Sequence, residues 1–291
     1  MLYAENFAEY LAQNKKSSAN TVASYIRDLK KFNAFISAEG KDFLTVSKKT
    51  VNSYISAMQQ DGQAASSVLR SIASLRSFYR YLIDNGRLSE NPVDGVNSPK
   101  LPERNISVLT SKETDLLLNQ PVACGFKGCR DKAMLELLYA TGLKVTELIA
   151  LKLSDLNLEG SSISCGSGVK KRTIPLGGIA ANAIAEYLPL RESNMHIDET
   201  NDCLFVNVGG GTMSRQGFWK IIKFYADKAK IKKDITPGTL RHSFAVHLIE
   251  NGADVSAVQE MLGHTAEFST KIYSDVVNGR LGNVYKKTKR K

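Results

Sequence analysis

The chain of 291 residues has few cysteines, and their spacing matches no metal-binding pattern. The four are Cys124, Cys129, Cys165 and Cys203, whereas zinc sites use closely spaced pairs of Cys and His. A cytosolic chain of this length can bury a sizeable core and needs no disulfides to fold. We therefore expect four reduced thiols, no metal ion and no cofactor.

Long apolar runs are absent as well. No stretch approaches the roughly 20 apolar residues that a membrane-spanning helix needs. The first residues, MLYAENFAEYLAQNKK, carry acidic side chains where a secretory signal would carry basic ones before an apolar segment. Both features predict a cytoplasmic protein.

Acidic side chains are fewer than basic ones. Lys and Arg number 39 against 29 Asp and Glu, a net charge of +10 with a pI near 9.3. Such a charge favours a polyanionic partner, either nucleic acid or a membrane surface. Five of the basic groups lie in the last six residues, KKTKRK, which could contact phosphates or be only a solvated tail. Charge alone does not decide the function.

The first ninety residues predict four helices. Apolar side chains recur at helical spacing around Phe7 and then through 20–37, 47–60 and 66–84. Ser47 is the expected N-cap of the third helix. The fourth helix and the residue after its end carry arginines that either line a DNA backbone or face solvent. These are Arg70, Arg76, Arg80 and Arg87.

A linker follows. The segment ENPVDGVNSPKLPERN has three prolines, a glycine and no apolar period, and each proline disfavours helix at the residue before it. We therefore expect one domain over 1–100, including linker residues, and a second over 101–291.

The second domain reads as mostly helical with a small sheet. A capping box from Thr110 to Glu113 opens it, and the helix over 131–141 stops at Gly142. Two or three short strands are expected around a hairpin at 166–168, and another strand over 203–208. The remaining helices are expected over 178–192, 214–230, 239–251, 254–262 and within 268–276. The fold class is therefore mostly α, in the α+β sense.

Three stretches of this domain carry a family resemblance. They are LLYATGLKVTELIALKLSDL, ITPGTLRHSFAVHLIENGADVSAVQEMLGHT and FSTKIYSDV, in which Arg241, His264 and Tyr273 follow one another at separations of 23 and 9 residues. This text resembles the tyrosine recombinases, or phage integrase family, especially the Xer-like group. The N-terminal helices are similar to the SAM-like core-binding domain of the same family.

The resemblance implies a partner and a reaction. The family binds duplex DNA at specific sites, as dimers or tetramers, with its two domains forming a clamp. Its tyrosine attacks a phosphodiester and forms a 3′-phosphotyrosyl link that conserves the bond energy, so neither ATP nor a metal is needed. The functions implied are recombination and integration of chromosomal or mobile-element DNA. The segment after the tyrosine helix is implied to pack into a neighbouring protomer.

The catalytic positions match only in part. Tyr273 matches the nucleophile, Arg241 the second arginine, and His264 the histidine after Leu-Gly. Lys144 stands where the family has its first arginine, so it keeps the charge but lacks the planar fork that grips two phosphate oxygens. Catalytic candidates are therefore Tyr273, Arg241, His264 and Lys144.

Two further family positions are substituted. Ser167 occupies the hairpin position of the lysine that protonates the leaving oxygen, and Gly238 occupies that of the first histidine. The departures predict impaired cleavage. The alternative to a recombinase is then a recombinase-derived DNA-binding regulator or architectural protein. An unrelated basic helical protein is the third possibility, which only the net charge supports.

Overall fold

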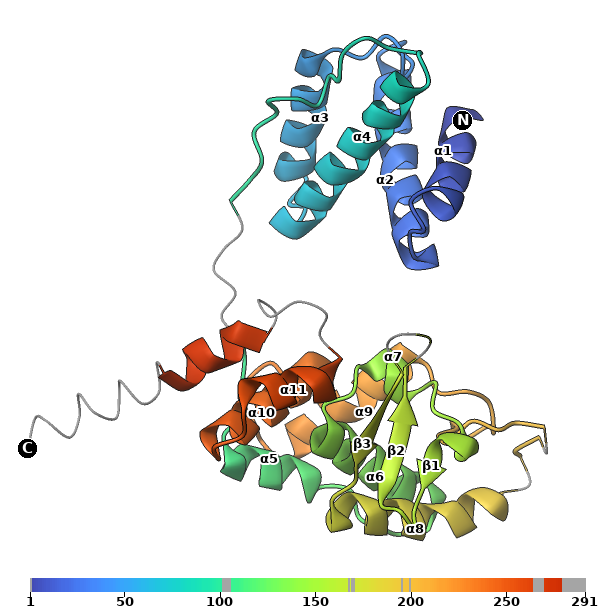
Figure 1. The fold of residues 1–291 in the computed structure, drawn as a ribbon, viewed down its shortest axis with the longest axis vertical. Helices are drawn as coiled ribbons and strands as arrows, with labels where there is room; N and C mark the ends of the chain where they lie inside the picture. The colour runs from blue at the N-terminus through green and yellow to red at the C-terminus, as the bar shows by residue number, and fades with distance from the viewer. Residues whose placement is uncertain are drawn as a thin grey trace, which may run out of the picture. The chain divides into compact units, whose positions relative to one another are not determined.

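The computed structural model describes residues 2–100, 106–166, 168, 171–194, 196–198, 200–263 and 270–278. The chain divides into two compact units, Met1–Arg104 and Asn105–Lys291 (Figure 1). Each unit has its own apolar core. No helix in the described ranges is both long enough and apolar enough to cross a membrane.

Four helices make up the first unit: α1 (Leu2–Gln13), α2 (Ala19–Ala38), α3 (Lys48–Gln60) and α4 (Ala65–Asp84). They are amphipathic, and the apolar stripes meet around Phe32 and Phe78, which are fully buried. Ser47 caps α3 by accepting a hydrogen bond from the Thr50 backbone N–H, as the sequence predicts. The four predicted helices are confirmed.

Two of the arginines on α4 form ion pairs inside this unit. Arg70 grips both oxygens of Asp28, with Nε–Oδ2 at 2.9 Å and Nη2–Oδ1 at 3.0 Å, and Asp28 is buried on α2. Arg80 pairs with Asp84 one turn later at 3.3 Å. Arg70 therefore helps to hold α2 against α4, a role that neither sequence alternative anticipated.

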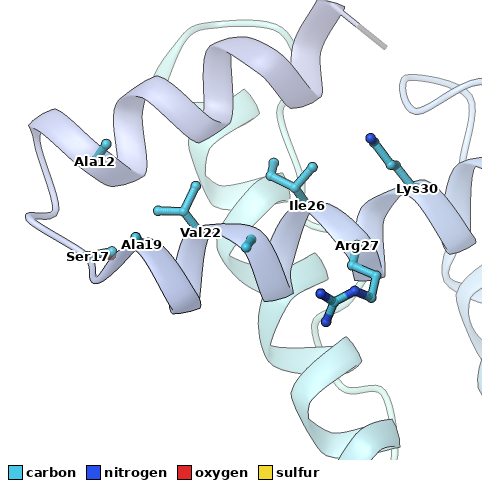
Figure 2. Close-up of a pocket in the computed structure, with 8 residues that line it drawn as sticks. Ala12, Ser17, Ala19, Val22, Ile26, Arg27 and Lys30 are labelled. Atoms are coloured by element: carbon cyan, nitrogen blue, oxygen red, sulfur yellow. The ribbon is translucent and has the colours of Figure 1, made fainter. Parts of the chain in front are cut away.

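A hollow of about 650 Å³ opens between α1 and α2. Figure 2 shows Val22 and Ile26 pointing from α2 toward α1, whereas Arg27 points to the other side. Lys30 stands at its edge. The lining is mostly apolar, with two basic side chains and the hydroxyl of Ser17, and it includes no acidic side chain.

The second unit is a helical domain with one small sheet. Its elements in chain order are α5 (Ser111–Leu118), α6 (Gly125–Thr141), α7 (Val145–Leu148), the 3-10 helix η1 (Leu153–Asp155), β1 (Leu156–Asn157), β2 (Ser162–Cys165), β3 (Arg172–Pro175), α8 (Gly178–Glu192), α9 (Arg215–Lys228), α10 (Pro237–Glu250) and α11 (Val255–Leu262). A further helix covers 270–278. Thr110 and Glu113 form the predicted capping box at the start of α5.

The sheet is antiparallel in the order β1-β2-β3, with Ile163 paired to Ile174 and Cys165 to Arg172 (Figure 1). Helix α6 is buried because it packs against both α8 and α10. This central position explains why α6 has almost no polar face, with even Asp131 and Arg130 buried as a pair.

Two sequence expectations need correction. The strand expected over 203–208 is absent, and that stretch makes only two isolated bridges, Lys152 to Cys203 and Val206 to Thr212. Its apolar residues Leu204 and Phe205 are buried in the core without a partner strand, so burial accounts for their character. The helix expected from 239 begins two residues earlier, at Pro237, whose fixed φ suits a first helical turn.

Candidate functional site

Arg241 lies near the start of α10 and is almost fully buried. Its Nη1 donates to the carbonyl oxygen of Gly142 at 2.5 Å, and its Nη2 donates to that of Leu262 at 2.8 Å. These carbonyls belong to the ends of α6 and α11, where a helix leaves backbone oxygens without an internal partner. One guanidinium therefore fixes the meeting point of three helices.

Gly142 shapes this meeting point. It ends α6 in the left-handed conformation, with φ +60°, which glycine adopts without steric cost. A Cβ at this position would lie 2.4 Å from Cδ1 of Phe244 and 2.7 Å from Cδ2 of Leu262. Only glycine therefore lets the chain turn here and lead directly into Leu143 and Lys144.

Lys144 is exposed just before α7. Its backbone N–H donates to Oε2 of Glu147 at 2.8 Å. Glu147 in turn binds Arg172 of β3 through both oxygens, at 3.0 and 3.1 Å, and Arg172 Nε donates to the Met261 carbonyl at 2.6 Å. The backbone of Lys144 is thus tied to β3 and α11, while its side chain is exposed.

Burial raises the pKa of the Glu147 carboxyl, but the Arg172 guanidinium and the Lys144 backbone N–H outweigh burial and leave that pKa below its ordinary value. Glu147 is therefore ionised at neutral pH, which keeps the network intact.

A basic pocket of about 820 Å³ opens beside this network. Lys144, Arg215 and Arg241 supply three positive side chains to its lining, and Trp219 of α9 adds a half-exposed ring. Gly238 also lines it. A cavity lined by three positively charged residues suits an anionic ligand such as a phosphate.

Tyr273 lies in helix 270–278 and is only 2% exposed. Its ring packs with Phe244 and Val258 of α10 and α11. Its hydroxyl oxygen is 2.9 Å from Nδ1 of His242 and also accepts a hydrogen bond from Arg241. Burial raises the pKa of the Tyr273 phenol, and the Arg241 charge only partly offsets it. The phenol therefore stays protonated at neutral pH.

His242 is the neighbour of Arg241 on α10. Burial lowers the pKa of its imidazole, and the positive Arg241 lowers it further. His242 is thus neutral at pH 7, so one of its ring nitrogens can accept the tyrosine proton in a hydrogen bond.

The structure brings three of the four sequence-predicted catalytic residues to one place. Arg241 contacts Tyr273 directly and shares the basic pocket with Lys144. His264 lies outside the described residues, as does Ser167. Gly238, the third substituted position, lines the same pocket. The catalytic roles of these residues remain predictions.

Sequence reasoning missed two residues here, His242 and Arg215. A signal for His242 was present, because it lies four residues after Gly238 and so shares its helix face. Arg215 had none, since only the tertiary structure brings the start of α9 to the pocket of Lys144 and Arg241.

The comparisons with known proteins cover both units. The phage integrase family matches residues 107–280, and the N-terminal SAM-like domain of phage integrases matches residues 4–86. The chain is 42% identical over 286 residues to the tyrosine recombinase XerD of Listeria monocytogenes serotype 4b, covering 97% of this chain and 96% of that protein. It is 39% identical over 277 residues to the tyrosine recombinase XerC of a Roseiflexus species, covering 94% and 88%.

Solved structures agree. The crystal structure of XerA recombinase shares 27% identity with a TM-score of 0.57, covering 98% of this chain and 97% of that one. The XerH site-specific recombinase bound to a palindromic difH substrate has the same fold, with a TM-score of 0.78 at 19% identity over 97% and 84%. Since family matches span most of both units and relatives near 40% identity run through nearly the whole length, this chain belongs to the phage integrase family, among its Xer-like tyrosine recombinases.

Proposed function

We propose that the protein binds duplex DNA at specific sites and recombines it, cleaving one strand through Tyr273 as a 3′-phosphotyrosyl intermediate. The observation that carries this proposal is the hydrogen bond from Arg241 to the Tyr273 hydroxyl. Arg241 also lines a pocket together with two further basic residues. Arg241 therefore contacts the nucleophile and also lines the pocket in which a phosphate would bind. The XerH structure, which is bound to its difH substrate after cleavage, has the same fold.

In this proposal the scissile phosphate binds in the basic pocket. Arg241, Lys144 and Arg215 stabilise the extra negative charge that develops on the phosphorus oxygens. Tyr273 is buried, so helix 270–278 must shift, or the phosphate must displace the Arg241 contact, before the hydroxyl reaches phosphorus. The proposal therefore includes a step that exposes the tyrosine on DNA.

We expect cleavage to be slow. Lys144 presents a single point charge where a guanidinium would offer two parallel donors. Gly238 offers no side-chain donor to the phosphate. Together with Ser167, these two positions define what a more active variant would need.

The decisive experiment is covalent trapping. The preferred site is first selected from random duplexes, and a nicked duplex carrying that site then serves as a suicide substrate. We expect a protein–DNA adduct that accumulates slowly and is absent from Tyr273→Phe. Site-specific binding without any adduct would instead indicate a recombinase-derived DNA-binding regulator.

We also propose that two or four copies assemble on the DNA, because exchange joins strands from two sites and so needs more than one nucleophile. The same proposal implies a cytoplasmic location, since the substrate would be cellular DNA.

A further inference from the structure

His242 stands at the junction of the tyrosine and the basic pocket. Its Nδ1 is 2.9 Å from the Tyr273 hydroxyl oxygen. The opposite edge of the ring faces Gly238, where a Cβ would lie 3.6 Å from Nε2. Because Gly238 lines the basic pocket, the imidazole connects the nucleophile on one side with the phosphate site on the other.

A second tyrosine–histidine pair in the same unit shows what a purely structural arrangement looks like. His247 lies 2.9 Å from the Tyr139 hydroxyl through Nδ1 and 2.9 Å from the Leu109 carbonyl through Nε2. The carbonyl can only accept, so Nε2 carries a hydrogen, and in the neutral ring Nδ1 then accepts from the tyrosine. This pair links α6 and α10 to the segment before α5. It has no counterpart to Arg241 or to the pocket in its described contacts.

The His242 pair differs in its surroundings. Tyr273 also contacts Arg241, and Arg241 lies in the pocket where we place the phosphate. Neutral His242 has a lone pair for the phenol proton. Once protonated, its ring would stand next to a phosphate carrying negative charge, and the attraction would favour the transfer.

We propose that His242 is the proton acceptor for the Tyr273 nucleophile, a role that rests on the proposed function. The Oη–H bond of Tyr273 breaks as the proton passes to Nδ1, and the phenolate oxygen forms a bond to phosphorus. The bond from phosphorus to the 5′ oxygen then breaks, and the departing oxygen takes a proton from solvent water. Religation runs the same steps in reverse, with the imidazolium returning its proton to Oη.

Asparagine separates the two contributions that the imidazole makes. Its side-chain oxygen lies near the position of Nδ1 and can accept the tyrosine hydrogen bond, but it cannot take the proton at neutral pH. We expect His242→Asn to bind the selected duplex with unchanged affinity and to form the adduct roughly 100-fold more slowly. Replacing Tyr273 by 3-fluorotyrosine, a more acidic phenol, should restore part of that loss in His242→Asn.

Adduct formation is measured in two backgrounds, the native chain and the Lys144→Arg, Ser167→Lys variant, in which two lost family groups are present and Gly238 is kept. The matched control is Tyr139→Phe, which removes the hydroxyl of the structural pair and should leave the adduct rate unchanged. An adduct rate in His242→Asn equal to that of its parent would overturn the proposed role while leaving recombination intact. Absence of any adduct in both backgrounds would overturn the strand-cleavage proposal itself, and the base role with it.

Discussion

Arg241 combines a structural role with the catalytic role that we propose for it. Two of its nitrogens hold the ends of α6 and α11, and the same guanidinium reaches both the tyrosine and the pocket. Burial lowers the pKa of Arg241 from its ordinary value, opposed by Tyr273 and Glu147. The guanidinium is nevertheless still charged at neutral pH, because the ordinary pKa of arginine lies far above 7.

Lys144 and Gly238, by contrast, are positions where the pocket lacks a donor that the family uses. We predict that Lys144→Arg, Ser167→Lys and Gly238→His together raise the rate of adduct formation by at least roughly 100-fold, whereas each alone gives far less. Groups that act on one transition state are strongly non-additive. The measurement is adduct accumulation on the nicked duplex, with Tyr273→Phe in the same background as the blank.

The backbone at Gly238 accepts a side chain. The residue lies within α10, outside the left-handed region, and a Cβ there would be 3.4 Å from Oγ1 of Thr236, an ordinary contact. A triple variant that binds DNA but forms adduct no faster than the native chain would show that these three positions do not limit the reaction.

At the scale of elements, the end of α6 is the most demanding turn near the site. We predict that Gly142→Ala destabilises the second unit by about 2–4 kcal/mol, from left-handed strain plus the clash with Phe244 and Leu262. Gly252→Ala is the control, since Gly252 also has a positive φ but nothing within 4 Å of its Cβ position. It should cost only the strain, about 1–2 kcal/mol.

Urea unfolding followed by tryptophan fluorescence measures this difference, because the chain has a single tryptophan, Trp219, which lies in the second unit. Equal losses from the two substitutions would mean that the space around Gly142 can relax.

The ion pair between α7 and β3 predicts a pH dependence. The pKa of Glu147 lies below its ordinary value in the folded state, because Arg172 and the Lys144 backbone N–H outweigh burial. Its stabilisation is therefore fully present above the unfolded pKa, near 4.5, and is lost as the pH falls through the folded pKa. We predict that Glu147→Gln lowers the unfolding free energy at pH 7 by about 1–3 kcal/mol.

The gap between Glu147→Gln and the native chain should shrink as the pH is lowered toward 3. Unfolding is compared across this range with Glu159→Gln, an exposed carboxyl on the turn after β1, as control. If the difference in unfolding free energy between Glu147→Gln and the native chain stayed constant with pH, the loss would come from altered packing or hydrogen bonding and not from the lost charge.

At the scale of the whole molecule, both units carry excess positive charge, which sums to +10. We predict that affinity for the selected duplex falls steeply with salt, by about 0.9 log units per log unit of salt for each phosphate neutralised. Titrations at several salt concentrations give the slope of log affinity against log salt concentration, once for the whole chain and once for 106–291 alone. A slope near zero for the whole chain would contradict the two-unit clamp on DNA.

The segment 279–291 bears on the assembly of the whole molecule, although it lies outside the described residues. The family resemblance implies that it joins protomers, so its deletion should weaken the binding of a second protomer more than that of the first. Gel shifts that resolve one and two bound copies measure both. Equal losses would show that the basic residues act only as an electrostatic arm.

The sequence by itself determined the elements and the family. Apolar periodicity and caps such as Ser47 and Thr110 act within one or two turns, so the helices could be predicted from local text. The motif around Arg241 and Tyr273 identified the family because its spacing is unusual. The same text identified Lys144 and Gly238 as departures.

The tertiary structure decided what surrounds those residues. The prediction of a strand over 203–208 was wrong because a buried irregular segment is as apolar as a strand paired within a sheet. Arg215 joins Lys144 and Arg241 in one pocket although more than twenty residues separate each from the next. Tyr273 meets His242 across 31 residues at 2.9 Å. Periodicity describes one helix at a time, whereas these contacts depend on how helices pack, and so only the folded chain places Tyr273 beside His242, the proton acceptor that we propose.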